Sequence, residues 1–171
     1  MAINFYDGDI KEAKERYIVH QVNCQGIMGS GLAKQIKEKW PEVNEAYVRK
    51  CLKQKNELLG TVLPVQTNDG KIICNVFGQY NYGSGKRQTS YLALFNGLCE
   101  VLKNAKSDVA IPANVGCCRG GANWIKVFNF IQTISEDFRY DINIYHYDES
   151  LIEESGTEGQ EEDVEKQETE E

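Results

Sequence analysis

The chain has 171 residues, of which 41% are hydrophobic, so it is long enough to bury the core of one domain. Its net charge of −7 is unevenly spread, because residues 151–171 hold ten of the 26 acidic residues and a single lysine. Residues 1–150 therefore carry a net charge of +2. We expect a folded domain over residues 1–149 and an acidic, disordered tail over residues 150–171, which has too few apolar side chains to offset its ordering entropy.

Composition also excludes several classes of protein. The first ten residues lack the basic and apolar regions of a signal peptide, so we expect six reduced cysteines and a cytoplasmic location, or a nucleo-cytoplasmic one in a eukaryote. No pair of short Cys/His spacings marks a zinc site, and we expect neither metal nor cofactor. No apolar run approaches the ~20 residues of a membrane-spanning helix. A basic stripe with interleaved aromatic residues is missing, so we do not expect direct binding to a nucleic-acid backbone. We expect the protein to be a monomer.

The chain alternates between strand and helix patterns. The predicted elements are strands at 3–6 and 17–22, helices at 32–40 and 41–55, strands at 61–66 and 71–77, a helix ending near 103, a strand at 109–112, a helix at 124–137 and a strand at 142–147. Thr89 is the predicted N-cap of the helix that ends near 103. Asn68-Asp69-Gly70 predicts a hairpin with a type I′ turn. The pattern predicts the α/β class, a three-layer α/β/α sandwich with a mixed, mostly parallel sheet.

Two glycine clusters each follow a strand and precede a helix. Gly26, Gly29 and Gly31 follow the strand at 17–22, and the run 116–121 follows the strand at 109–112. A helix N-terminus offers unpaired N–H groups, and glycine lets a phosphate approach the backbone closely. Because carboxyl ends of strands in such sheets form ligand sites, two such loops on one rim suit a diphosphate. The alternative is that the glycines serve tight turns with positive φ angles.

The pieces that carry a family resemblance are Gly8-Asp9-Ile10, Val22-Asn23, Gly29–Ala33, Asn75–Gln79 and Gly116–Gly121 followed by Trp124. Together they resemble the macrodomain, the ADP-ribose-binding fold, over roughly residues 1–147. The spacing of these pieces is similar to that found in one branch of the family. This branch contains the yeast-type ADP-ribose-1″-phosphate phosphatase, the terminal ADP-ribose protein glycohydrolase and small phage macrodomain proteins.

The resemblance implies a role for each matching position. Asp9 would accept a hydrogen bond from the adenine amino group, Ile10 would offer its backbone N–H to the base, and Asn23 would contact the distal ribose. Two backbone segments would wrap the pyrophosphate. The implied ligand-binding residues are Asp9, Ile10, Asn23, Gly29, Ser30, Gly31, Leu32, Ala33, Gln79, Val115, Gly116, Cys117, Cys118, Arg119, Gly120 and Gly121. From the residues alone, Asp9 can equally be a helix cap and Asn23 can satisfy a strand end.

Two departures from the family bear on catalysis. Glycohydrolase members carry a lysine near the place of Gln79 and an aspartate near that of Gly120, and this chain has neither. Lys86 lies in the corresponding loop as a catalytic candidate, although an exposed loop lysine is more often a solvated charge. Cys118 and Arg119 replace small or apolar residues.

His20 is the other catalytic candidate, because a histidine three residues before the strand-end asparagine resembles the phosphatase member. A histidine exchanges protons near neutral pH. The alternative is a hydrogen-bonded core residue on the buried side of its strand.

We therefore expect binding of ADP-ribose or ADP-ribose-1″-phosphate, with hydrolysis at the distal ribose 1″ position as a phosphatase or mono-ADP-ribosyl hydrolase. The competing hypothesis is a non-catalytic reader of ADP-ribosylated protein. A dinucleotide oxidoreductase is disfavoured, because the Gly-x-Gly-x-x-Gly order is missing.

Overall fold

The computed structural model of the protein describes residues 2–147, so the predicted tail at residues 150–171 lies outside the described residues. The elements, with 3₁₀ helices marked η, are β1 Ile3–Asp7, η1 Ile10–Glu12, β2 Tyr17–Asn23, α1 Gly31–Lys39, α2 Pro41–Gln54, η2 Lys55–Glu57, β3 Val62–Gln66, β4 Ile72–Gln79, α3 Tyr91–Asn104, β5 Val109–Pro112, α4 Trp124–Ser135 and β6 Ile142–His146. Every predicted strand and helix is present, with ends within two residues of those expected. No helix within residues 2–147 has the length and apolar character needed to cross a bilayer.

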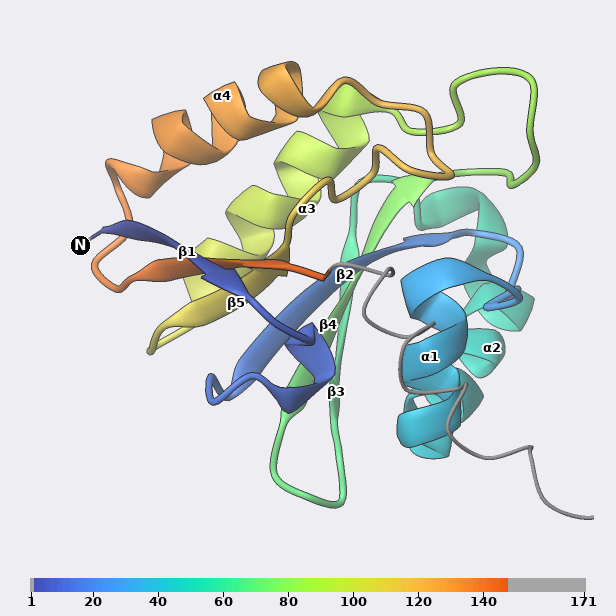
Figure 1. Ribbon diagram of the computed structural model, residues 1–171. Coiled ribbons are helices and arrows are strands. Elements are labelled where there is room, and N and C mark those ends of the chain that lie inside the picture. The colour runs from blue at the N-terminus through green and yellow to red at the C-terminus, as the bar shows by residue number, and fades with distance from the viewer. Residues whose placement is uncertain (1, 148–171) are drawn as a thin grey trace, which may run out of the picture.

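The six strands form one sheet in the order β1-β6-β5-β2-β4-β3. Neighbouring strands run parallel except β3, which pairs antiparallel with β4 in the predicted hairpin. Helices α3 and α4 cover one face of the sheet, and α1 and α2 cover the other (Figure 1). The fold is therefore the predicted three-layer α/β/α sandwich with a mixed, mostly parallel sheet.

Alternate residues of the central strand β2 supply two hydrophobic cores, because successive side chains of a strand point to opposite faces. Val19 belongs to the core that contains Leu94 of α3 and Ile131 of α4. Ile18 belongs to the core that contains Ile36 of α1 and Tyr47 of α2. All six side chains are fully buried. Strand β2 leads into the first glycine loop and pairs with β5, which leads into the second. Packing on both faces of β2 thus gives the loops a firm base.

Two local predictions were wrong. Ser90, not Thr89, caps α3, since its hydroxyl accepts the hydrogen bond of the Ala93 N–H. The hairpin turn is not type I′, because only Gly70 of the Asp69-Gly70 pair has a positive φ, of 87°, whereas a type I′ turn requires positive φ at both.

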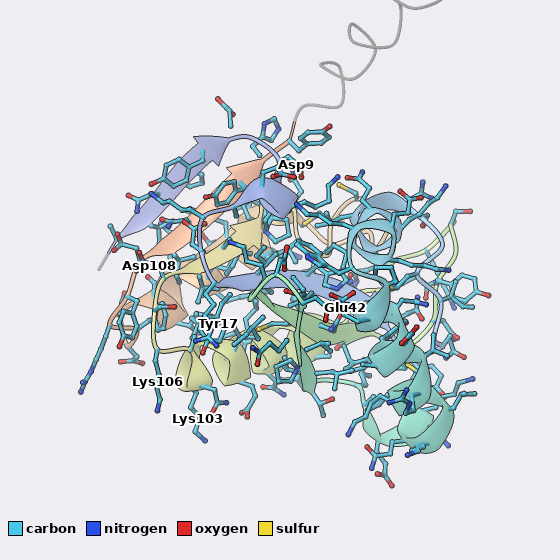
Figure 2. All side chains as sticks on the ribbon, turned by 90° about the horizontal axis from the view of Figure 1, so that it is seen from below. Asp9, Tyr17, Glu42, Lys103, Lys106 and Asp108 are labelled. Carbon is cyan, nitrogen blue, oxygen red and sulfur yellow. The ribbon has the colours of Figure 1, made fainter. Side chains whose placement is uncertain are left out.

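The loops after β1, β2, β4 and β5 gather at one edge of the sheet, because these strands run in the same direction (Figure 1). Figure 2 shows Tyr17 and Asp108 side by side at the opposite edge, where β2 and β5 begin. Asp9 lies apart from them, beyond the end of β1. The parallel sheet thus brings together loops that are about a hundred residues apart in the sequence.

Candidate functional site

A cleft of about 890 Å³ lies at the carboxyl edge of the sheet. Every ligand-binding and catalytic residue that the sequence predicted lines it, from Asp9 and Ile10 at one end to Lys86 on another loop. A second hollow, of about 440 Å³, lies near Tyr17 at the other edge and contains none of them. The structure therefore brings the predicted site residues to one place.

The first glycine loop ends at the amino terminus of α1. Gly26 and Gly31 have positive φ angles of 79° and 58°, which favour glycine. Ser30 is the N-cap residue, yet its side chain makes no capping hydrogen bond. Among residues 2–147, no group accepts a hydrogen bond from the backbone N–H groups of 29–33. The first turn of α1 thus presents a row of unpaired donors and the positive end of a helix dipole to the cleft.

The second glycine loop is folded by its own backbone. Cys117, Gly121 and Ala122 donate to carbonyl groups of the same loop, at 2.8–3.0 Å. Asn114 adopts a φ of 60°, a conformation rare for a residue with a side chain. In the described part of the chain, the N–H groups of Gly116 and of 118–120 have no acceptor. They are a second set of donors lining the same cleft.

Arg119 connects the two loops. Its Nε atom lies 3.6 Å from the point that a Cβ on Gly31 would occupy, so the guanidinium group rests against the first loop while its backbone belongs to the second. The side chain is exposed, and no acidic side chain within residues 2–147 pairs with it. A free guanidinium group with its fixed fork of N–H donors is well suited to a phosphate.

At the far end of the cleft, Asp9 takes the capping role that the sequence left open. Its carboxylate accepts the Lys11 N–H at 2.9 Å and lies 3.2 Å from the Lys11 ammonium group. A carboxylate has about four acceptor positions, so it retains capacity for a ligand N–H. Ile10 is buried beside it.

Asn23 also satisfies the strand end, the alternative left open by the sequence. Its Oδ1 accepts from the Gln25 N–H and the Tyr47 hydroxyl at 2.9 and 2.8 Å, and its Nδ2 donates to the Ile27 carbonyl at 2.8 Å. These bonds fix the direction of the carboxamide. One N–H of Nδ2 remains for a ligand.

His20 is a core residue with a defined tautomer. Its Nε2 lies 2.6 Å from Oδ1 of Asn75, whose Nδ2 donates to the Leu63 carbonyl. Since Oδ1 of Asn75 must accept, Nε2 of His20 carries the proton and Nδ1 is a bare acceptor. Nδ1 has no partner within residues 2–147. Burial lowers the pKa of His20 from 6.5 to about 4, so the ring is neutral near pH 7 and cannot act there as a general acid.

The remaining candidates differ in their exposure and in the number of their hydrogen-bond partners. Lys86 is exposed at the rim, and no carboxylate in the described part of the chain forms an ion pair with it. Gln79 is fixed, because its Oε1 accepts from Gln21 at 2.7 Å and its Nε2 donates to the Asn81 carbonyl at 2.8 Å. Burial raises the pKa of the Cys117 thiol to about 11.

Sequence reasoning missed Gln21, Asn114 and the end of β6, where Tyr145, His146 and Tyr147 line the cleft. A polar residue within the buried strand pattern at 17–22 was the available signal for Gln21. Within residues 2–147, no group of three or more His, Cys, Asp or Glu side chains is arranged to hold a metal ion.

Comparison with known proteins gives a consistent result. The Macro domain family model matches residues 19–130, more than half of the chain. A DNA ADP-ribosyl glycohydrolase from Mycobacterium tuberculosis is 32% identical over 130 residues, which are 71% of this chain and 35% of that protein. An ADP-ribose 1″-phosphate phosphatase from Saccharomyces cerevisiae is 30% identical over 112 residues, 61% of this chain and 63% of that protein. The match thus spans about a third of the first relative and under two thirds of the second.

Solved structures show the same fold. The macrodomain of Mycobacterium tuberculosis DarG superposes with a TM-score of 0.73 at 28% identity, covering 84% of this chain and 96% of that one. Thermosipho africanus DarTG, solved in complex with ADP-ribose, gives a TM-score of 0.72 at 22% identity, covering 84% of this chain and 41% of that one.

Proposed function

Since the chain belongs to the macrodomain family, we propose that its cleft binds ADP-ribose and that it hydrolyses a bond at the distal ribose 1″ position. The observation that carries the proposal is the pair of glycine loops. Unpaired N–H groups of 29–33 and of 116 and 118–120 line one cleft from two loops. Such paired sets of donors suit the two phosphates of a diphosphate. Arg119 adds a positive charge between them.

The two ends of the cleft differ in a way that orients the ligand. Asp9 and Ile10 offer an acceptor and a backbone donor, which suit the amino group and a ring nitrogen of adenine. Asn23, His20 and Lys86 lie toward the other loops and suit the distal ribose. The name of the yeast relative supports ADP-ribose-1″-phosphate as a substrate, and that of the mycobacterial relative supports an ADP-ribosyl group.

In the catalytic form of the proposal, Asn23 donates its remaining N–H to a ribose hydroxyl and holds the sugar. Nδ1 of His20 is the candidate base for the attacking water, and this role requires that the buried atom become accessible from the cleft when the ligand binds. Lys86 approaches from the rim and neutralises the departing phosphate. Water attacks the phosphorus of the 1″-phosphate and breaks its bond to the C1″ oxygen, or attacks C1″ and breaks its bond to the substituent. In both cases the departing atom takes up the proton that the water loses.

A reader of ADP-ribosylated protein is the second candidate, and two observations favour it. His20 is 1% exposed and its pKa lies near 4, which weakens it as a base. Gln79 stands near the place where the glycohydrolase members that the sequence resembles carry a lysine.

One set of assays separates these outcomes. The chain is titrated calorimetrically with ADP-ribose, and incubated with ADP-ribose-1″-phosphate, mono-ADP-ribosylated protein and ADP-ribosylated DNA. Turnover of one substrate supports the enzyme, and saturable binding without turnover supports the reader. Failure to bind ADP-ribose overturns both.

The adenine assignment has its own test. Asp9→Ala should weaken ADP-ribose binding by about 1.5 to 3 kcal/mol, because a hydrogen bond to a charged group is lost. Asp108→Ala, at the opposite edge of the sheet (Figure 2), is the matched control and should leave the affinity unchanged. Equal affinities for the two variants would remove Asp9 from the ligand site.

A further inference from the structure

A polar network lies beneath the second glycine loop and connects it to the sheet. Nε2 of Gln21, on β2, donates to Oε1 of Gln79 at 2.7 Å and to Oγ1 of Thr89 at 2.8 Å. Oγ1 of Thr89 in turn donates to the Gly116 carbonyl at 2.7 Å. The backbone N–H of Thr89 donates to the Gly120 carbonyl at 3.0 Å. Thr89 therefore holds both ends of the loop that spans Gly116 to Gly120.

The direction of every hydrogen bond in this network is determined. Nε2 of Gln79 is committed to the Asn81 carbonyl, so its Oε1 must accept. The Thr89 hydroxyl has one hydrogen, and the Gly116 carbonyl requires it, so Oγ1 must accept from Gln21. Both N–H groups of Gln21 are consequently used. Removing the hydroxyl leaves one N–H of Gln21 without its acceptor at a largely buried position, and it takes from the Gly116 carbonyl one of its two donors, so that only the Ala122 N–H remains.

The side chains of the network pack closely against three glycine residues. A Cβ on Gly78 or Gly116 would overlap the Gln21 carboxamide, and a Cβ on Gly120 would overlap the Thr89 hydroxyl. Gly78 lies within β4, where glycine is unfavourable unless another group must approach closely. Three glycines thus leave room for two polar side chains, and the loop rests directly on them.

We propose that Thr89 and Gln21 are positioning residues, which hold the second glycine loop in the conformation that presents its free N–H groups to the ligand diphosphate. The inference rests on the proposed function, because the ligand is ADP-ribose. The α3 cap predicted for Thr89 is supplied by Ser90. This leaves the Thr89 hydroxyl to serve the loop.

The test compares Thr89→Val, which removes the hydroxyl at constant shape, with Thr89→Ser, which retains it. Thr133→Val is the matched control, since the Thr133 hydroxyl bonds to its own helix on the exposed side of α4. Hydrogen exchange of a peptide covering residues 113–122 reports on the loop without any ligand. Calorimetry with ADP-ribose then measures the effect on binding.

We expect Thr89→Val to accelerate exchange at Cys117, Gly121 and Ala122 and to weaken ADP-ribose binding about tenfold, whereas Thr89→Ser stays within about twofold of wild type. Thr133→Val should change neither. Unchanged exchange and affinity in Thr89→Val would overturn the inference, while the proposed function would stand as long as the wild-type chain binds. If the wild-type chain does not bind ADP-ribose, the proposed function fails and the exchange result still decides whether the network holds the loop.

Gln21→Glu is the second variant, in case Thr89→Val does not fold. It keeps the shape of the side chain but replaces both donated hydrogens by an acceptor facing Oε1 of Gln79. We expect faster exchange over residues 113–122 and weaker binding. A hydrogen-exchange rate over residues 113–122 equal to that of wild type in Gln21→Glu would contradict the inference as directly as an unchanged rate in Thr89→Val.

Discussion

The stability of the protein should depend on the protonation of His20. Burial lowers the pKa of this histidine to about 4, whereas the unfolded chain has the ordinary value of 6.5. Between these values the unfolded state binds a proton that the folded state does not, so the free energy of unfolding rises with pH there. The stabilisation is complete above pH 6.5 and is lost as the pH falls toward 4.

The size of the effect follows from the two pKa values. The full difference corresponds to about 3 kcal/mol, and the part lost between about pH 7.5 and about pH 5 is about 2 kcal/mol. This is a large fraction of the stability of a typical domain. The lowered pKa follows from burial, and the hydrogen bond to Asn75 opposes it only in part because Asn75 carries no negative charge.

Urea unfolding across this pH range measures the effect. The chain contains only two histidines, so His20→Gln removes the buried one and His146→Gln, at a half-exposed side chain 3.6 Å from Asp7, serves as the control. Wild type and the control should lose about 2 kcal/mol more stability on acidification than His20→Gln. Equal losses in all three proteins would refute the assignment of His20 as a neutral, buried group.

Other predictions concern the loops and their supports. Gly120→Ala should destabilise the fold by about 1–3 kcal/mol in urea unfolding and weaken ADP-ribose binding, because its Cβ would overlap neighbouring atoms, whereas Gly8→Ala, which has open space, should unfold like wild type. Tyr47→Phe should lower the free energy of unfolding by about 1–3 kcal/mol, since it removes the buried donor to Asn23; an unchanged value would argue against that bond. Arg119→Ala should weaken ADP-ribose binding at least about fivefold at low salt without changing the unfolding midpoint, and an unchanged affinity would exclude a role for the guanidinium group.

Much of the fold could be predicted because its signals are local. A strand, a glycine cluster and a helix follow one another twice, at Gly26–Gly31 and at Gly116–Gly121, and parallel pairing then requires both loops to meet at one edge. The family resemblance was needed to predict Asp9 and Asn23 at the two ends of the site. Their roles were inferred from their positions in a family pattern and not from any periodicity of the sequence.

The remaining features depend on contacts between distant residues. Thr89 and Ser90 are both good helix caps, and the choice between them depends on the bond of Thr89 to Gly116. The environment of His20 is set by Asn75, 55 residues away, so the alternation of β2 leaves the direction of its ring undetermined. Gln21 meets its partners only after β2 and β4 have paired.

The central claim is that both glycine loops bind the diphosphate of one ADP-ribose molecule. An NMR titration of ¹⁵N-labelled protein with ADP-ribose tests it most directly. We predict that the amide signals of residues 29–33 and of 116 and 118–120 shift together with one saturation curve, while the Gly70 amide in the distant hairpin turn does not shift. Shifts confined to one loop, or no saturable shift in either, would contradict the account.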